Sequence, residues 1–149
     1  MFGINQQFLM WMFGAAFIAA GVAARLGLWK KWYWTTRGAV YGYIPLGLLF
    51  IVYSFNPQAE ERLGAYFVLY QAAVVLLILL GVWWSLRPPA FVRPTWVHWV
   101  EQHPEAVLEA MADAVKGGEE WESHVTSPEA VDTWAKTLRK KKRRPKGKS

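Results

Sequence analysis

One uncharged stretch of 24 residues, Leu63–Leu86, constrains this chain more than any other feature. Its only polar side chains are those of Tyr66, Tyr70, Gln71 and Ser85. As an α-helix it would extend roughly 36 Å at about 1.5 Å per residue, enough to cross a hydrocarbon core about 30 Å thick. A Trp-Trp pair and then an Arg-Pro-Pro sequence close the stretch, as expected where a span meets lipid headgroups. We therefore predict a membrane-spanning helix.

Two further apolar runs precede this stretch. Phe8–Ala24 has 17 apolar or small residues, which is the short limit for a span. Gly38–Phe55 has 18 residues and contains Pro45, which neighbouring helices in a bilayer can tolerate as a kink. The segment between them, Arg25–Arg37, mixes basic and aromatic residues and is typical of an interfacial turn. The predicted fold class is an all-α membrane protein with three transmembrane helices.

The rest of the chain has a different composition. The sequence is 54% hydrophobic and 16% aromatic, but its apolar residues are concentrated before Leu86 and its charges after it. The net charge is +6, and eight of the 17 basic residues lie in Arg139–Ser149. We therefore predict a membrane domain over residues 1–93, a small and mainly helical soluble region over 94–138, and a basic disordered tail over 139–149. The absence of cysteine excludes disulfides, thiolate metal sites and c-type haem attachment.

Basic residues predict the orientation, because short loops rich in Lys and Arg stay on the cytoplasmic side. The loop Arg25–Arg37 has four, whereas Asn56–Arg62 has one together with Glu60 and Glu61. Met1–Gln7 has none, and we expect no cleaved signal peptide there. The sequence thus predicts a multi-pass protein of a prokaryotic plasma membrane, with its N-terminus outside and its C-terminus in the cytoplasm.

Prolines and glycines divide the soluble region into short predicted helices. Thr95 is placed to cap one helix over Trp96–Gln102, and Pro104 begins a second that ends at Gly117. The alternation over Trp121–Val125 is typical of a short strand, although a lone strand cannot form a sheet. A Ser-Pro-Glu sequence then begins a third helix. The apolar faces of the last two helices comprise Val107, Leu108, Met111 and Val115, and Val131, Trp134, Ala135 and Leu138.

Small residues recur at helical spacing in the first two predicted spans. Small residues four apart let helix backbones approach closely, so they form either a docking face for a partner or the packing among the three helices. Gln71 either faces a cofactor or, as is more common for such a residue, makes an interhelical hydrogen bond. The candidate helix-packing residues are Gly14, Ala16, Ala20, Gly21, Gly38, Gly42 and Gln71.

Ionisable residues of the soluble region give little support for a metal site. His98 and His103 are five residues apart, roughly 140° around a helix, so they cannot bind one metal from a single helix. Glu120, Glu122 and His124 would share one face of an extended strand and could hold a divalent ion, but no fourth ligand is visible and a solvated strand edge is more common. A carboxylate stripe, either a solvent face or a partner for the basic tail, is formed by Glu105, Glu109 and Asp113.

Several function classes are disfavoured by what the sequence lacks. The predicted spans contain no ionisable residue in their interior, which disfavours a transporter, a proton relay or a haem site. We find no phosphate-binding loop, dinucleotide fingerprint, zinc-protease motif or nucleophile elbow. We therefore expect no enzyme activity, no cofactor, no metal and no small-molecule substrate.

Two hypotheses of function remain. The leading one is a non-catalytic accessory or scaffold subunit of a larger membrane complex, with the lipid bilayer and other membrane subunits as its partners. The alternative is a membrane-tethered binding module whose basic tail engages anionic lipid headgroups, ribosomal RNA or another nucleic acid. The candidate polyanion-binding residues are Arg139, Lys140, Lys141, Lys142, Arg143, Arg144, Lys146 and Lys148.

Overall fold

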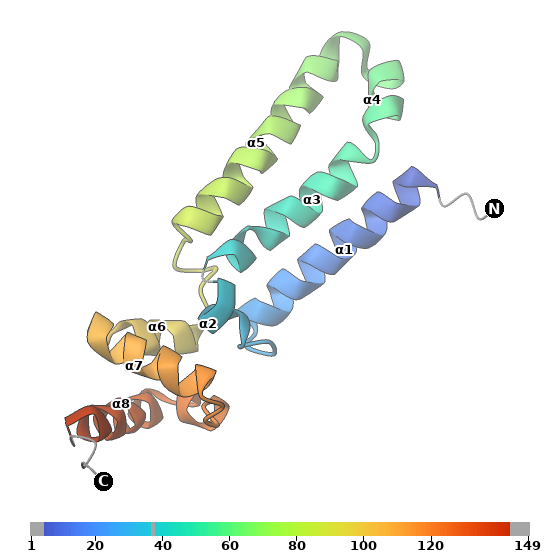
Figure 1. Ribbon diagram of the computed structural model, residues 1–149. Helices are drawn as coiled ribbons and strands as arrows, with labels where there is room; N and C mark the ends of the chain where they lie inside the picture. The colour runs from blue at the N-terminus through green and yellow to red at the C-terminus, as the bar shows by residue number, and fades with distance from the viewer. Residues whose placement is uncertain (1–4, 37, 144–149) are drawn as a thin grey trace. The chain divides into compact units, whose positions relative to one another are not determined.

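A computed structural model describes residues 5–36 and 38–143, and all regular secondary structure in this part of the chain is helical (Figure 1). The all-α part of the predicted fold class is therefore confirmed. The chain divides into two compact units, the first ending at Val92 and the second beginning at Arg93.

The first unit is a row of three long helices in which α3 lies between α1 and α5 (Figure 1). The most extensive contacts join α1 to α3. Further extensive contacts join α5 both to α3 and to the 3-10 turn that precedes α3. The elements of the unit are α1 (Gln6–Arg25), α2 (Trp32–Thr36), the 3-10 helix η1 (Ala39–Gly42), α3 (Tyr43–Tyr53), α4 (Asn56–Leu63), the 3-10 helix η2 (Gly64–Tyr66) and α5 (Phe67–Leu86).

Two helical stretches of this unit are long and apolar enough to cross a membrane. They are α1, with 20 residues, and the continuous stretch Asn56–Leu86, with 31 residues. The stretch Ala39–Tyr53 is also apolar but shorter. The connecting segment Asn56–Arg62, predicted as a loop, is helical, because it forms most of α4. Pro57 lies in the first turn of α4, where a proline is tolerated, and the Glu and Arg residues that follow are good helix formers.

Glycines bring the three helices into backbone contact. A Cβ atom on Gly14 would lie 2.7 Å from the carbonyl oxygen of Gly47, and a Cβ on Gly47 would lie 2.6 Å from that of Gly14. On the other side of α3, a Cβ on Gly42 would lie 2.7 Å from the carbonyl oxygen of Gly81. Any larger side chain at Gly14, Gly47 or Gly42 would therefore separate two backbones, so α3 contacts both neighbours only because these residues are glycine.

Polar side chains fasten the helices at two places. The Trp11 indole N–H donates to the Ser54 hydroxyl at 2.7 Å, and the Tyr70 hydroxyl donates to the Val52 carbonyl at 2.6 Å. These bonds connect α1 and α5 to the C-terminal end of α3. Elsewhere the Arg25 side chain at the end of α1 donates from Nε to a backbone carbonyl beyond α5, that of Phe91, at 2.6 Å.

The second unit contains three short helices and one 3-10 turn packed around a small apolar core. Ser127 caps the last helix, since its hydroxyl accepts a bond from the Ala130 N–H at 3.1 Å. The predicted apolar stripe of that helix is confirmed, because Val131, Trp134, Ala135 and Leu138 are all buried. The elements are α6 (Thr95–Glu101), α7 (Glu105–Lys116), the 3-10 helix η3 (Glu122–Val125) and α8 (Pro128–Arg143).

Several predicted boundaries in this unit are wrong. Residues Trp121–Val125 do not form a strand, because the described part of the chain offers no second strand to pair with, and they turn into η3 instead. Thr95 begins α6 rather than capping it, and Pro104 precedes α7 rather than opening it. The basic tail does not begin at Arg139, since α8 continues through Arg143 on good helix formers. The remaining predicted tail cations, Arg144, Lys146 and Lys148, lie outside the described residues.

The substitution Gly14→Leu tests the contact between α1 and α3. A leucine there must displace the Gly47 backbone and Ile51, so we expect the free energy of unfolding in detergent to fall by about 1–3 kcal/mol. The matched control is Ala16→Leu on the exposed side of α1, for which we expect a change within about 0.5 kcal/mol. Equal stabilities of the two variants would contradict a close α1–α3 contact.

Candidate functional site

Four of the predicted helix-packing residues lie in contacts inside the first unit. A Cβ on Gly21 would lie 2.7 Å from Cγ1 of Ile44, which extends the contact that Gly14 makes between α1 and α3. Gly38 has a φ of 91°, and a Cβ there would lie 2.6 Å from the Ser85 carbonyl oxygen. With Gly42 against Gly81, these glycines all make close contacts within the unit.

The other three predicted packing residues differ from one another. Ala16 is exposed and Ala20 is half-buried. Gln71 donates from Nε2 to the Asn56 side-chain oxygen at 2.9 Å, which joins α5 to the first residue of α4. Gln71 thus makes a hydrogen bond between helices of the same unit.

The acidic and histidine groups considered above as metal ligands are not brought together in the described part of the chain. Within residues 5–36 and 38–143, no group of three His, Cys, Asp or Glu side chains could hold a metal ion. Because the chain turns at η3, Glu120, Glu122 and His124 do not share the face of a strand. The His124 ring instead stacks on Trp134, with ring centroids 5.4 Å apart and planes 16° from parallel.

His103 forms a clasp between the turn that precedes α7 and the helix α8. Its Nδ1 lies 3.1 Å from the Trp99 carbonyl oxygen, and its Nε2 lies 2.9 Å from a carboxylate oxygen of Asp132. Both partners are hydrogen-bond acceptors, so the ring satisfies both only as the imidazolium and satisfies one as the neutral form. The clasp fixes the position of α7 at its start, next to Pro104.

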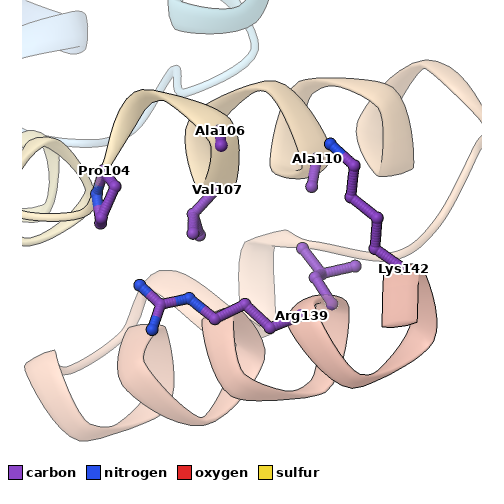
Figure 2. Close-up of a pocket in the computed structure, with 7 residues that line it drawn as sticks. Pro104, Ala106, Val107, Ala110, Arg139 and Lys142 are labelled. Carbon is purple, nitrogen blue, oxygen red and sulfur yellow. The ribbon is translucent and has the colours of Figure 1, made fainter. Parts of the chain in front are cut away.

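A groove between α7 and α8 is the site in the second unit that combines charge with apolar surface (Figure 2). It has a volume of about 360 Å³. Figure 2 shows the Lys142 side chain extending from α8 across the groove toward Ala110 of α7, whereas the Arg139 side chain runs along α8 with its guanidinium directed away from Lys142. The lining residues are Pro104, Ala106, Val107, Ala110, Leu138, Arg139 and Lys142.

The helical register of α8 explains why cations line this groove. Val131, Ala135, Leu138 and Lys142 follow the i, i+4, i+7, i+11 spacing that places residues on one face of a helix. Lys142 therefore occupies the position at which the buried apolar stripe would continue. Lys142 was predicted to lie in a disordered tail. The helical spacing from Val131 to Leu138 nevertheless predicts its position on this face of α8.

The two cations at the groove are available to a ligand. Among the described residues, the side chains of Arg139 and Lys142 make no ion pair and no hydrogen bond, and both residues are exposed. Their neighbour Lys141 lies 3.9 Å from the Glu119 carboxylate, a long and solvent-exposed pair of small energetic value. The predicted carboxylate partners of the basic segment, Glu105, Glu109 and Asp113, are exposed and make no such pair in the described part of the chain.

Comparisons with models of protein families, with curated proteins and with solved structures find no match. The functional interpretation therefore rests on the residues themselves. They combine a unit with long apolar helices and a unit with an apolar groove flanked by two unpaired cations.

The substitution His103→Ala tests the clasp at the edge of the groove. The ring is largely buried, with 12% of its side chain exposed, and its removal leaves the Trp99 carbonyl without this partner. We expect the opening free energy of α8, measured by hydrogen exchange in detergent, to fall by about 1–2 kcal/mol. The control is His98→Ala, because the His98 ring makes no hydrogen bond among the described residues, in contrast to the His103 ring. Equal exchange in both variants would show that the clasp does not hold α8.

Proposed function

We propose that this chain is a small, non-catalytic integral membrane protein that anchors a basic helical domain at an anionic surface. The membrane part is supported by the exposure of α5, in which only Val74 is buried. Large apolar side chains along it are open, including Val68 at 72% and Leu86 at 77%. Such a surface is favourable in lipid, where apolar side chains need no protein cover.

The proposal includes three spans, with Ala39–Tyr53 as the shortest. At about 1.5 Å per residue this stretch is roughly 22 Å long, less than a hydrocarbon core of about 30 Å. A short span is accommodated by local thinning of the bilayer at a modest cost, and α3 lies between two neighbours that it contacts closely. The excess of basic residues in Arg25–Arg37 supports an outside N-terminus and a cytoplasmic second unit in a prokaryotic plasma membrane.

The observation that carries the functional proposal is the cluster of exposed cations around α8. Lys136, Arg139, Lys140, Lys141 and Lys142 are all exposed on this one helix. The connection between α5 and α6 has eight residues and joins the second unit, which contains α8, to the proposed spans. Fully extended, it is at most about 28 Å long. Each Lys or Arg near an anionic lipid surface contributes about 1 kcal/mol, so a few of them together give useful binding. We propose the anionic membrane surface as the partner of α8.

A second candidate, a non-catalytic accessory or scaffold subunit of a larger membrane complex, is favoured by a different observation. A groove of about 390 Å³ runs between α3 and α5 and is lined almost entirely by apolar side chains, with Gly42 and Gly81 at its floor. A helix of a partner subunit could pack against such small residues. This candidate becomes the stronger one if α8 engages no anionic surface.

Co-sedimentation separates these candidates. The full chain in nanodiscs of phosphatidylcholine is mixed with dense vesicles that contain phosphatidylglycerol, with dense phosphatidylcholine vesicles, or with ribosomes. We expect the nanodiscs to pellet with the anionic vesicles at low salt and to be released at high salt, because the attraction is screened. Glutamine at all eight basic positions of Arg139–Ser149 should abolish pelleting while preserving the helix, since glutamine is a good helix former.

Two results would overturn the lipid assignment. Pelleting with ribosomes alone would identify an RNA phosphate backbone as the partner. Pelleting with neither anionic vesicles nor ribosomes would leave the accessory-subunit candidate.

The proposed orientation predicts where reporter fusions are found. Fusions after Ser149 and within Arg25–Arg37 should report the cytoplasm, and a fusion within Asn56–Arg62 should report the outside, because basic loops are retained inside. A cytoplasmic signal from the Asn56–Arg62 fusion would invert the orientation and remove the setting proposed for α8.

A further inference from the structure

We infer that the groove between α7 and α8 is a binding site for one anionic phospholipid. Its phosphate lies between Arg139 and Lys142, and the first carbons of an acyl chain lie along the accessible apolar surface of Pro104, Ala106 and Ala110. The inference rests on the proposed function, because the lipid comes from the membrane surface that α8 engages. Beyond a general attraction of α8 to an anionic surface, it assigns one defined site for one lipid molecule.

The arrangement of the two cations suits one phosphate. Arg139 and Lys142 are three residues apart on α8, so their Cβ atoms are about 5–6 Å apart. Their charged ends point away from each other in Figure 2, but both long side chains are exposed, so a change of rotamer brings the two charges to one phosphate. A guanidinium offers a planar fork that matches two phosphate oxygens, and an ammonium adds a compact charge for a third. Neither cation is occupied by a carboxylate in the described part of the chain.

The apolar floor decides which phosphate compound fits. A free phosphate or a nucleic-acid backbone would use the cations but would leave the exposed apolar surface of Pro104 and Ala106 in water. Each buried methylene group of an acyl chain contributes about 0.8 kcal/mol, so a phosphate that carries hydrocarbon gains from both parts of the groove. The volume of about 360 Å³ falls in the range of about 300–1,000 Å³ typical of small-molecule sites.

The test uses the absence of cysteine from the chain. Ala110→Cys places a single thiol in the groove, and Ser123→Cys places a control thiol on the exposed surface of η3. The full-length variants are reconstituted into phosphatidylcholine vesicles with or without phosphatidic acid, and the rate of modification by a water-soluble maleimide is measured. At a lipid concentration about ten times the dissociation constant, we expect phosphatidic acid to slow modification of the Ala110→Cys variant about tenfold and to leave the control unchanged.

Charge variants show whether the groove cations are responsible. Combined with Ala110→Cys, the pair Arg139→Gln and Lys142→Gln should abolish the protection. The pair Lys136→Gln and Lys140→Gln removes the same charge from α8 but not from the groove, and should reduce the protection much less than the groove pair does.

A bulk variant tests the apolar requirement without a change in charge. Ala106 is exposed and lines the groove, so Ala106→Leu partly fills it with little risk to folding. We expect this change to remove the protection of the Ala110→Cys thiol while co-sedimentation with anionic vesicles is unchanged. Retained protection would overturn the acyl-chain part of the inference.

Other outcomes separate this inference from the proposed function. Equal slowing of the Ala110→Cys and Ser123→Cys variants would mean that the whole unit lies on the anionic surface without a seated lipid, which overturns the inference and leaves the proposed function standing. Protection by inorganic phosphate equal to that by phosphatidic acid would overturn the assignment to lipid. Failure of the unsubstituted chain to co-sediment with anionic vesicles would overturn the proposed function itself.

Discussion

Contact between helix backbones at glycine is the interaction on which the first unit depends. In the lipid environment that we propose for this unit, helices gain little from burying apolar side chains against each other, so close packing and hydrogen bonds hold them together. Gly14 and Gly47 bring α1 against α3, and Gly42, the last residue of η1, brings the start of α3 against the Gly81 backbone of α5. The hydrogen bond from Trp11 to Ser54 strengthens the first of these pairs.

The second unit depends on the ordinary hydrophobic effect. Val131, Trp134 and Leu138 are buried under α7 and η3, and this burial sets the rotation of α8 about its axis. Once that rotation is fixed, the residues one turn further along must fall on the same side. The placement of Arg139 and Lys142 beside an apolar groove therefore follows from the packing of residues that precede them.

Sequence patterns predicted the elements whose signal is local and missed those that depend on tertiary contacts. Long apolar runs were readable from their length and lack of charge, and the α8 stripe was readable because its burial repeats with the helical period. The predicted strand at Trp121–Val125 was wrong because alternation alone supplies no pairing partner. Gly47 and Gly81 were missed, although an isolated glycine within a helix is costly and usually indicates a close approach. The groove could not be foreseen, since it requires the register of α7 against α8.

The order of the helices in the first unit has a consequence for biosynthesis. The three long helices lie side by side in the same order as in the chain, so each one packs against the helix made just before it (Figure 1). Such neighbour-to-neighbour contacts have a low sequence separation and require no long loop to close first. The growing chain can thus complete one helix pair before the next helix emerges, and α3 provides a finished surface for α5 as soon as α5 leaves the ribosome.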